Sequence, residues 1–357
     1  MALHRADIPA AVTDLLFAGT AIPAHPLALN ASRQFDPLRQ RALSRYYIDA
    51  GSGGLAVGVH ATQFEIRDVG LYEPVLESAM ETANDWTPIG GARPLIMVAG
   101  LAGGTAQAVQ EARTAVSMGY HAGLLSLAAM KGSSDEELIA HCEAVAAEMP
   151  VVGFYLQPAV GGIHLSVDFW RRFAQIDNVI AVKTAPFNRY RTLDVIRGVV
   201  EAGAEERVAI YTGNDDHIVL DLLEPFTSLR DGREVRVRIR GGLLGHWSVW
   251  TKRAVEQLAR IHTAIDTGVI DADLLALNSK ITDCNRAVFD VENDFAGCIP
   301  GCHEILRRQG LLEGTWCLNP AENLSPGQAE ELDRVQAGYP EMNDDAFVAA
   351  NLDRWLA

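Results

Sequence analysis

Short apolar runs alternate with longer amphipathic segments along most of the chain. The runs recur about every 25 to 35 residues, roughly the length of a βα unit, and this alternation predicts a parallel sheet. We expect strands at residues 15–22, 54–59, 95–100, 122–127, 151–156, 179–184, 208–212 and 239–244. Eight strands, each followed by a helix, predict an α/β protein with a (β/α)8 TIM barrel. No glycine-rich dinucleotide fingerprint follows the first strand, which disfavours an open doubly wound sheet.

Helix signals fall between these runs. Ser134 precedes a helical pattern that carries Glu137 three residues later, and Ser166 precedes a second such pattern. Both serines match the chemistry of an N-cap. Gly119 and Gly203 lie where helices should end, because glycine readily adopts the left-handed conformation of a C-cap.

After the eighth predicted strand the pattern is helical. We expect helices over residues 249–267, 272–293, 302–309, from a capping-box start at Ser325, Pro326 and Gln328 to near Gly338, and over 345–356. No domain-length linker interrupts the chain. We therefore predict a barrel over residues 1–250 and a C-terminal helical region over 251–357, packed on the barrel or at a subunit interface. Trp355 and Phe347 would otherwise form an uncovered apolar patch.

Composition and charge bound the class of protein. With 357 residues, 48% of them hydrophobic and 21% charged, the chain is an ordinary globular protein. Its formal net charge of -16 argues against nucleic acid or an anionic membrane as a partner, because both require a basic surface. No run reaches the roughly 18 apolar residues of a membrane span, and the N-terminus lacks a signal pattern. We expect a cytoplasmic protein.

The cysteines suggest reduced thiols. They are five in number, odd and sparse for this length: Cys142, Cys284, Cys298, Cys302 and Cys317. Cys298 and Cys302 with His303 raise the alternative of a metal site. Zinc requires four well-spaced ligands and no second pair follows, so we interpret these residues as helix packing and expect neither metal nor cofactor.

Lys183 is the residue whose position is least ordinary. It ends the run Val-Ile-Ala-Val, and the chain has four lysines among its 30 basic residues. A charged ammonium is costly to bury. The lysine either extends out of the strand end or is retained for its amine.

Barrel geometry selects the candidate residues. Reacting groups of a (β/α)8 enzyme lie at the C-terminal ends of strands. Those ends carry Ala24 and His25, Val59 and His60, Ser126, Tyr155, Lys183, Asn214 and Asp215, and Gly245 and His246. Tyr155 and Lys183 are 28 residues apart. They should end adjacent strands about 4.8 Å apart, so the phenol reaches the amine if both side chains point into the barrel.

This pair suits imine chemistry. A neutral lysine amine attacks a ketone to give a carbinolamine and then an iminium, which is an electron sink for cleaving or forming the neighbouring C–C bond. Burial lowers a lysine pKa from about 10.4 toward neutrality. The tyrosine hydroxyl can transfer the protons that these steps need. The alternative for Tyr155 is a core tyrosine whose hydroxyl is satisfied elsewhere.

These motifs carry a family resemblance. VVGFYLQPAVGG, followed by LSVDFWRRFAQIDNVIAVKTA, resembles the dihydrodipicolinate synthase and N-acetylneuraminate lyase family of class I aldolases. The resemblance extends over GSGGLAVGVHATQ, VAGLAGGTAQAVQEARTAVSMGYHAGLL, YTGNDD and RGGLLGHWS, from about residue 17 to 309. It implies that Lys183 is the Schiff-base lysine and Tyr155 the catalytic tyrosine. It also implies a homodimer or homotetramer acting on a 2-oxo acid.

The departures from the family pattern concern the substrate. The second strand usually ends in Gly-Thr-Thr-Gly-Glu, whose amides bind a carboxylate and whose hydroxyl joins a proton relay. Here the chain reads Gly58, Val59, His60, Ala61, Thr62, so the amides of Val59 and His60 are expected to hold the carboxylate without that hydroxyl. A Pro-Tyr-Tyr segment is replaced by residues 126–130, and a substrate-binding arginine by Val160. These losses argue against dihydrodipicolinate synthesis itself.

Three histidines add polar groups to the predicted barrel mouth. His25, His60 and His246 end the first, second and eighth strands, which adjoin when a barrel closes. A neutral imidazole can orient substrate hydroxyls or replace the relay hydroxyl. The alternative is histidines that fill the mouth with ordinary hydrogen bonds. Asn214, Asp215 and Gly242 are further expected substrate-binding residues.

The sequence therefore predicts a class I lyase. Lys183 forms a Schiff base with pyruvate or a related 2-oxo acid, and Tyr155 shuttles protons. Two alternatives stay open: a dehydratase of a sugar-derived 2-oxo acid, and a catalytically silent binding or regulatory barrel. The tail over residues 311–357 is expected to cover the barrel or add to an interface.

Overall fold

The computed structural model of the protein describes residues 2–357. Contacts divide the chain into two compact units. The first contains Ile96–Leu243 and the N-terminal residues up to Thr20, and the second contains Ala21–Leu95 and Leu244–Ala357. The predicted division at residue 250 marks the end of the βα pattern and remains a prediction.

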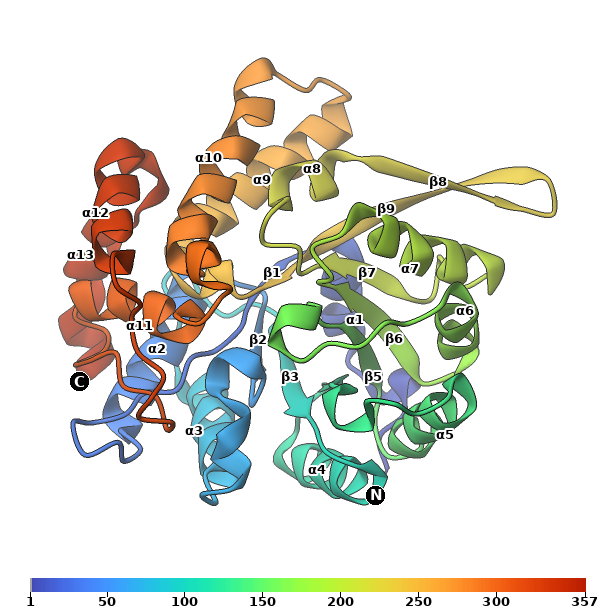
Figure 1. The fold of residues 1–357 in the computed structure, drawn as a ribbon, viewed down its shortest axis with the longest axis horizontal. Helices are drawn as coiled ribbons and strands as arrows, with labels where there is room; N and C mark the ends of the chain where they lie inside the picture. Colours follow the sequence, from blue (N-terminus) through green and yellow to red (C-terminus); the bar gives the residue numbers. More distant parts are fainter. Residues whose placement is uncertain (1) are drawn as a thin grey trace. The chain divides into compact units, whose positions relative to one another are not determined.

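A parallel sheet forms the centre of the first unit (Figure 1). Its strands follow one another in the order β3, β4, β5, β6, β7, β9. They are β3 Ile96–Leu101, β4 Ala122–Leu125, β5 Val151–Tyr155, β6 Val179–Thr184, β7 Ala209–Thr212 and β9 Arg233–Leu244. Every residue of β3 to β7 is buried. Continuous apolar runs of this kind are typical of parallel strands covered on both faces.

Two helices of this unit, α5 and α6, begin where the sequence predicts caps. The α-helices are α1 Ala10–Ala18, α4 Thr105–Met118, α5 Asp135–Ala146, α6 Val167–Gln175, α7 Arg189–Glu201 and α8 Ile218–Leu223. Ser134 and Glu137 form the predicted capping box of α5. Ser166 caps α6 by accepting a hydrogen bond from Phe169 N–H. Gly119 ends α4 in the left-handed conformation. These three signals are confirmed.

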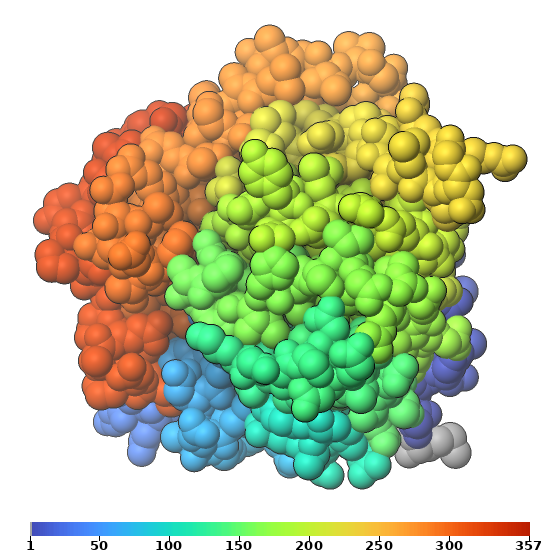
Figure 2. Space-filling model, turned by 45° about the vertical axis from the view of Figure 1, so that its right-hand side comes forward, coloured from blue at the N-terminus to red at the C-terminus, as the bar shows by residue number. Residues whose placement is uncertain are grey.

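A two-stranded arm was not predicted. Strand β8, Pro225–Arg230, runs antiparallel to the first half of β9, and Asp231 and Gly232 join them with φ of 51° and 73°. A type I′ hairpin turn requires positive φ at both central residues, and Asp-Gly is a favoured pair for that turn. Figure 1 shows the arm as a long ribbon, and its tip projects in Figure 2. The alternation of Val235, Val237 and Ile239 with arginines was the available sequence signal for this part of β9.

The second unit contains two strands and most of the C-terminal helices. Strands β1 Ala21–Pro23 and β2 Gly54–Val57 are linked by a parallel bridge between Ala24 and Ala56. The α-helices are α2 Pro37–Ala50, α3 Tyr72–Asp85, α9 Thr251–Thr267, α10 Ala272–Val288, α11 Cys298–Arg308, α12 Gln328–Gly338 and α13 Asp345–Leu356. Short 3₁₀ helices complete the two units: η1 Arg5–Asp7, η2 His60–Thr62, η3 Phe64–Arg67, η4 Ala128–Met130, η5 Pro158–Val160, η6 His246–Ser248, η7 Val291–Asn293 and η8 Pro340–Met342.

Two predicted elements need correction. The strand expected at residues 15–22 is wrong for its first half, where Ala10–Ala18 forms helix α1, and β1 spans Ala21–Pro23. Gly19 separates the two with φ of 93°. The helix expected over residues 272–293 ends at Val288, because Asp290 adopts a left-handed conformation with φ of 57°.

The C-terminal helix is packed rather than exposed. Trp355 of α13 is fully buried, and its ring centroid lies 5.4 Å from that of Tyr46 on α2. Phe347 packs against the same tyrosine at 6.4 Å. The covering contact expected for Trp355 and Phe347 is therefore made with α2, a helix of the same unit.

Candidate functional site

Lys183 lies one residue before the end of β6. In the sheet register it pairs with Phe154 of β5 and with Tyr211 of β7. Successive strand residues point to opposite faces and register partners share a face, so Lys183 lies on the same face as Phe154. Its Nζ is 4.4 Å from the centroid of the Phe154 ring, and the residue is 7% exposed. The amine occupies an apolar position with little access to water.

Burial controls the protonation of this amine. Loss of hydration disfavours the ammonium and lowers the pKa of Lys183 from 10.5 to about 8, and the negative charge of Asp215 opposes that shift. A pKa near 8 leaves roughly a tenth of the amine neutral at pH 7, against about one part in three thousand for an ordinary lysine. The site therefore supplies a nucleophilic amine near neutral pH.

Gly213, directly after β7, leaves the space that the lysine side chain occupies. A Cβ at this position would lie 2.5 Å from Lys183 Cε and 2.8 Å from Ala185 Cβ. The chain then turns, and Asp215 N–H donates to the Gly213 carbonyl at 3.1 Å. Asp215 is 4% exposed. The buried carboxylate of Asp215 therefore lies two residues after Gly213, which packs against the lysine side chain.

Tyr155 and Lys183 lie on different faces of the sheet in this register, and the expected catalytic role of Tyr155 stays a prediction. Tyr155 pairs in register with Thr184, so it points to the face opposite Lys183. Its ring packs against Trp170 of α6 at a centroid distance of 5.4 Å. Its hydroxyl oxygen lies 3.4 Å from the Leu165 nitrogen and 3.5 Å from the Leu165 carbonyl oxygen. In this structure Tyr155 is a helix-facing core residue.

Replacement of Tyr155 by phenylalanine tests this placement. We expect the rate of imine formation at Lys183 to fall by less than about tenfold, because the hydroxyl contacts main chain rather than the amine. Loss of a general acid would cost about 10²- to 10⁴-fold. The rate is measured by borohydride trapping and intact mass; a loss of 10²-fold or more would assign the proton transfer to Tyr155 after all.

Asn214 is hydrogen-bonded within the protein, and its expected contact with substrate stays a prediction. It is fully buried. Its amide donates to Thr192 Oγ1 at 3.1 Å and to Asp221 Oδ2 at 3.0 Å, and its Oδ1 accepts from Phe187 N–H at 3.0 Å. Because the amide N–H groups and the amide oxygen of Asn214 are all hydrogen-bonded, the side chain attaches the loop after β7 to α7 and α8.

His25 fills a buried space in the second unit. It is fully buried, with Nδ1 2.8 Å from the Pro26 carbonyl oxygen and Nε2 2.8 Å from Ser44 Oγ of α2. Burial lowers the pKa of His25 to about 4, so the ring is neutral at physiological pH. Both ring nitrogens have partners within the protein. This arrangement favours the structural alternative over the expected substrate contact.

The loop after β2 is closed by a threonine hydroxyl. Thr62 Oγ1 accepts from the N–H groups of Gly58 at 2.9 Å and Val59 at 3.2 Å, and donates to the His25 carbonyl at 2.6 Å. The Val59 amide, expected to hold a carboxylate, is therefore already hydrogen-bonded. His60 is half-buried, and its expected role stays a prediction.

The C-terminal tail is attached to this loop. Gln63, the residue after η2, is 1% exposed and has a positive φ of 68°. Its Oε1 accepts a hydrogen bond from Leu318 N–H at 2.6 Å. Arg33 donates to the neighbouring Cys317 carbonyl. Within the second unit, the tail therefore holds the loop that carries His60.

Two further expected residues have contacts of their own. His246 opens η6 and is 6% exposed, with Nδ1 3.5 Å from Asn285 Nδ2 on α10. Burial lowers the pKa of His246 to about 4. Gly242 lies in β9, where its N–H donates to the Thr20 carbonyl at 3.2 Å. Their substrate-binding roles remain predictions.

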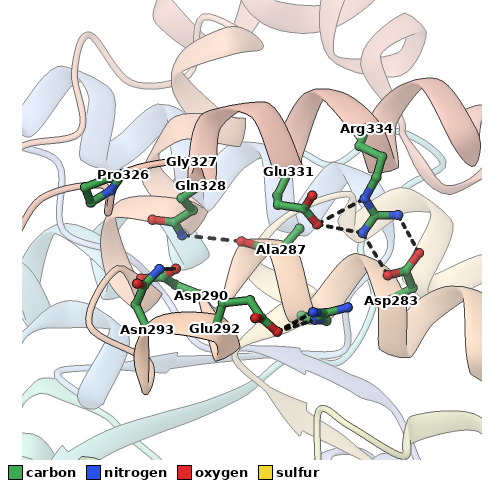
Figure 3. A pocket seen from close by; sticks show the side chains of 11 residues that line it. Asp283, Ala287, Asp290, Glu292, Asn293, Pro326, Gly327, Gln328, Glu331 and Arg334 are labelled. Carbon is green, nitrogen blue, oxygen red and sulfur yellow. Dashed lines mark hydrogen bonds and ion pairs between the residues drawn. The ribbon is translucent and has the colours of Figure 1, made fainter.

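A separate hollow of the second unit lies between α10 and α12 (Figure 3). Arg334 donates to both carboxylate oxygens of Asp283 at 2.8 Å and to Glu331 at 2.9 Å. Arg286 pairs with Glu292. Four carboxylates and two arginines line this hollow, and both arginines are paired within it, so the lining indicates no particular ligand.

Residues 2–357 lack two features that mark other classes of function. No three histidine, cysteine or acidic side chains of this part of the chain gather closely enough to hold a metal ion. Among the same residues, no helix combines the length and the apolar composition needed to cross a membrane.

Phe154 and Asp221 were missed by sequence reasoning. The ring of Phe154 packs against the Lys183 amine. The alternation of side chains within β5 was the sequence signal that could have identified it. Asp221 accepts from Thr212 Oγ1 at 2.6 Å and pairs with Arg189 of α7. No local sequence signal identifies that buried network, because its members come from separate elements.

Comparison with known proteins places this arrangement in a family. Residues 19–225 match the model of the Dihydrodipicolinate synthetase family. A 4-hydroxy-tetrahydrodipicolinate synthase of Kosmotoga olearia is 29% identical over 129 residues, which are 36% of this chain and 43% of that protein.

Two solved structures share the fold. The first is a chloride-inhibited dihydrodipicolinate synthase from Acinetobacter baumannii complexed with pyruvate, with a TM-score of 0.70 and 20% identity over 90% of this chain and 98% of that one. The second is YagE, a prophage protein of the dihydrodipicolinic acid synthase family from E. coli K12 in complex with pyruvate, with a TM-score of 0.71 and 18% identity over 92% of this chain and 99% of that one.

The fold is a (β/α)8 barrel with additional C-terminal helices, as the strand pattern predicts. Such a barrel with a buried lysine near the end of its sixth parallel strand belongs to the class of barrel lyases. The chain is a member of the dihydrodipicolinate synthetase family.

Proposed function

We propose that the chain is a class I lyase that forms a Schiff base between Lys183 and pyruvate or a related 2-oxo acid. The observation that carries this proposal is the burial of Lys183 against Phe154, which lowers the pKa of its amine to about 8. The neutral amine attacks the ketone carbon, and the resulting iminium withdraws electrons from the adjacent carbon. C–C cleavage or formation then follows at that carbon.

Relatives support the class of substrate. Two structurally similar members of the family were solved with pyruvate bound. For this chain, pyruvate is the simplest 2-oxo acid that an amine in this position would take. The proposal is limited to the 2-oxo acid half of the reaction.

The second substrate is proposed to differ from that of dihydrodipicolinate synthesis. The chain has Ala128–Met130 as η4 where the synthases carry tyrosines, and Val160 ends η5 where they carry an arginine. Val160 supplies no cation for a second carboxylate, and residues 128–130 supply no phenol. An uncharged aldehyde held by hydroxyl contacts fits this change better.

Borohydride trapping tests the proposal. The protein is incubated with pyruvate and a panel of other 2-oxo acids, reduced, and examined by intact mass and peptide mapping. We expect one stable adduct per chain, on the peptide that contains Lys183. Scoring pyruvate release against water loss then separates a lyase from a dehydratase. If Lys183 gains no adduct with any member of the panel, the imine mechanism is wrong and a silent barrel is favoured.

The pH dependence of trapping gives an independent check. Because the amine reacts when neutral, we expect the initial rate of adduct formation to rise about tenfold from pH 6 to pH 7 and to level off above pH 8. The lowered pKa of Lys183 places this midpoint near 8. A rate that keeps rising to pH 10 would show an ordinary, solvated lysine.

A further inference from the structure

We propose that the aromatic ring of Phe154 stabilises the iminium cation that forms at Lys183. This inference rests on the proposed imine chemistry and adds to it a residue that touches the reacting nitrogen. Lys183 Nζ lies over the ring, 4.4 Å from its centroid. A cation within about 6 Å of a ring centroid is attracted by the negative charge of the ring face. Because Nζ becomes the iminium nitrogen, the ring faces the new charge where it forms.

The sheet fixes the ring in this position. Phe154 of β5 and Lys183 of β6 are register partners in neighbouring parallel strands, and the side chains of register partners share a face. Every residue of both strands is buried. A group that is already in place when charge develops stabilises that charge without reorganising. The ring of Phe154 is therefore preorganised for a cation at Nζ.

Burial makes such a group necessary. A cation formed at a buried nitrogen loses the hydration that would stabilise it in water. Two other residues lie beside this nitrogen or act on its charge. The hydroxyl of Tyr211, the register partner on β7, donates to the Leu16 carbonyl at 2.8 Å, and Asp215 acts on the amine through its negative charge. The ring adds a contact at the nitrogen itself and replaces none of the proton transfers of the reaction.

The charge balance of the reaction predicts the pH at which the ring matters. Above a pH of about 8 the amine of Lys183 is mostly neutral. The amine, the ketone and one proton then give an iminium cation and water, as a C=N bond replaces the C=O bond, and the nitrogen is positive in the product alone. At pH 6 the ammonium and the ketone give the same iminium and water, with one positive charge on the nitrogen before and after. The ring should therefore favour the iminium at high pH and change the equilibrium little at low pH.

Fluorinated phenylalanines at position 154 test this role, because fluorine removes negative charge from the ring face and changes the size of the ring little. At pH 9 we expect the equilibrium constant for iminium formation with pyruvate to fall stepwise through mono-, di- and trifluorinated phenylalanine, by about tenfold in the last. At pH 6 the series should stay within about twofold, because the ring attracts the ammonium and the iminium alike. The constant is obtained from the borohydride-trapped adduct, measured by intact mass over a range of pyruvate concentrations.

Phe226 provides the matched control. It is a buried phenylalanine of β8, paired in register with Val237, and its fluorination should leave the constant within about twofold at both pH values. Phe154→Leu removes the ring, keeps an apolar side chain and should lower the constant by about tenfold at pH 9 alone. A flat series at position 154, or an equal fall at both pH values, would show that the ring only fills space; with an adduct present in the wild type, the imine at Lys183 would still stand. Absence of any adduct in the wild type would overturn both proposals.

Discussion

Replacement of Lys183 by methionine is expected to abolish the borohydride-trapped adduct and to reduce turnover by about 10⁴-fold or more. Methionine has similar length and no amine, so no covalent intermediate can form. The protein should remain folded: burial disfavours the ammonium in the native state, so the lysine costs stability at pH 7. Its removal should maintain or raise the melting temperature. Intact mass, turnover and thermal unfolding are measured on the same preparation.

The three other lysines provide controls. Lys252 and Lys280 lie near Glu256 and Glu341, and Lys131 is exposed. Changing each to methionine should leave the adduct on the peptide that contains Lys183. An adduct that persists in Lys183→Met would place the reactive amine elsewhere and refute the proposed mechanism.

Replacement of Asp49 by alanine is expected to lower the free energy of unfolding by about 2 to 3 kcal/mol. Asp49 of α2 is 0% exposed at its side chain. One oxygen accepts from Trp86 Nε1 at 3.1 Å and Ile89 N at 2.9 Å, and the other from Trp355 Nε1 at 2.7 Å and from Arg354. Alanine would leave the buried Trp355 N–H without this acceptor, and an unpaired buried donor costs its full desolvation energy. Arg354 is 42% exposed and keeps its hydrogen bond to the Thr87 carbonyl. Denaturant unfolding measures the change.

Asp353→Ala is the matched control for that experiment. Asp353 lies on the same helix as Arg354 and Trp355 but is exposed. Its replacement should change the free energy of unfolding by no more than about 0.5 kcal/mol. If Asp49→Ala were equally mild, the attachment of α13 to α2 would not depend on this carboxylate.

Sequence patterns located the parallel strands well because parallel strands are buried on both faces. The predicted strand at residues 179–184 coincides with β6, and the predicted start of the strand at residue 151 with β5. The first strand was misplaced because the apolar run before Gly19 suits a helix equally. A short apolar run does not by itself distinguish a buried helix from a buried strand.

The relation between Tyr155 and Lys183 shows where spacing is insufficient. A separation of 28 residues puts both at the ends of adjacent strands, yet the register pairs Tyr155 with Thr184 and Lys183 with Phe154. Shifting a register by one residue moves a side chain to the other face. The pairing of β5 with β6 shifts its register between Val151 and Val152. The local sequence gives no sign of such a shift.

The sequence by itself determined the barrel class, the family and the unusual lysine, because burial periodicity and the strand-end motif are local properties of the chain. The tertiary structure decided what surrounds that lysine. Phe154 lies beside it and Asp215 acts on its charge, whereas Tyr155, Asn214 and His25 have partners within the protein scaffold. The physical reason is that a side chain's partner depends on register and on elements distant in the sequence, whereas its burial depends mainly on its own neighbours.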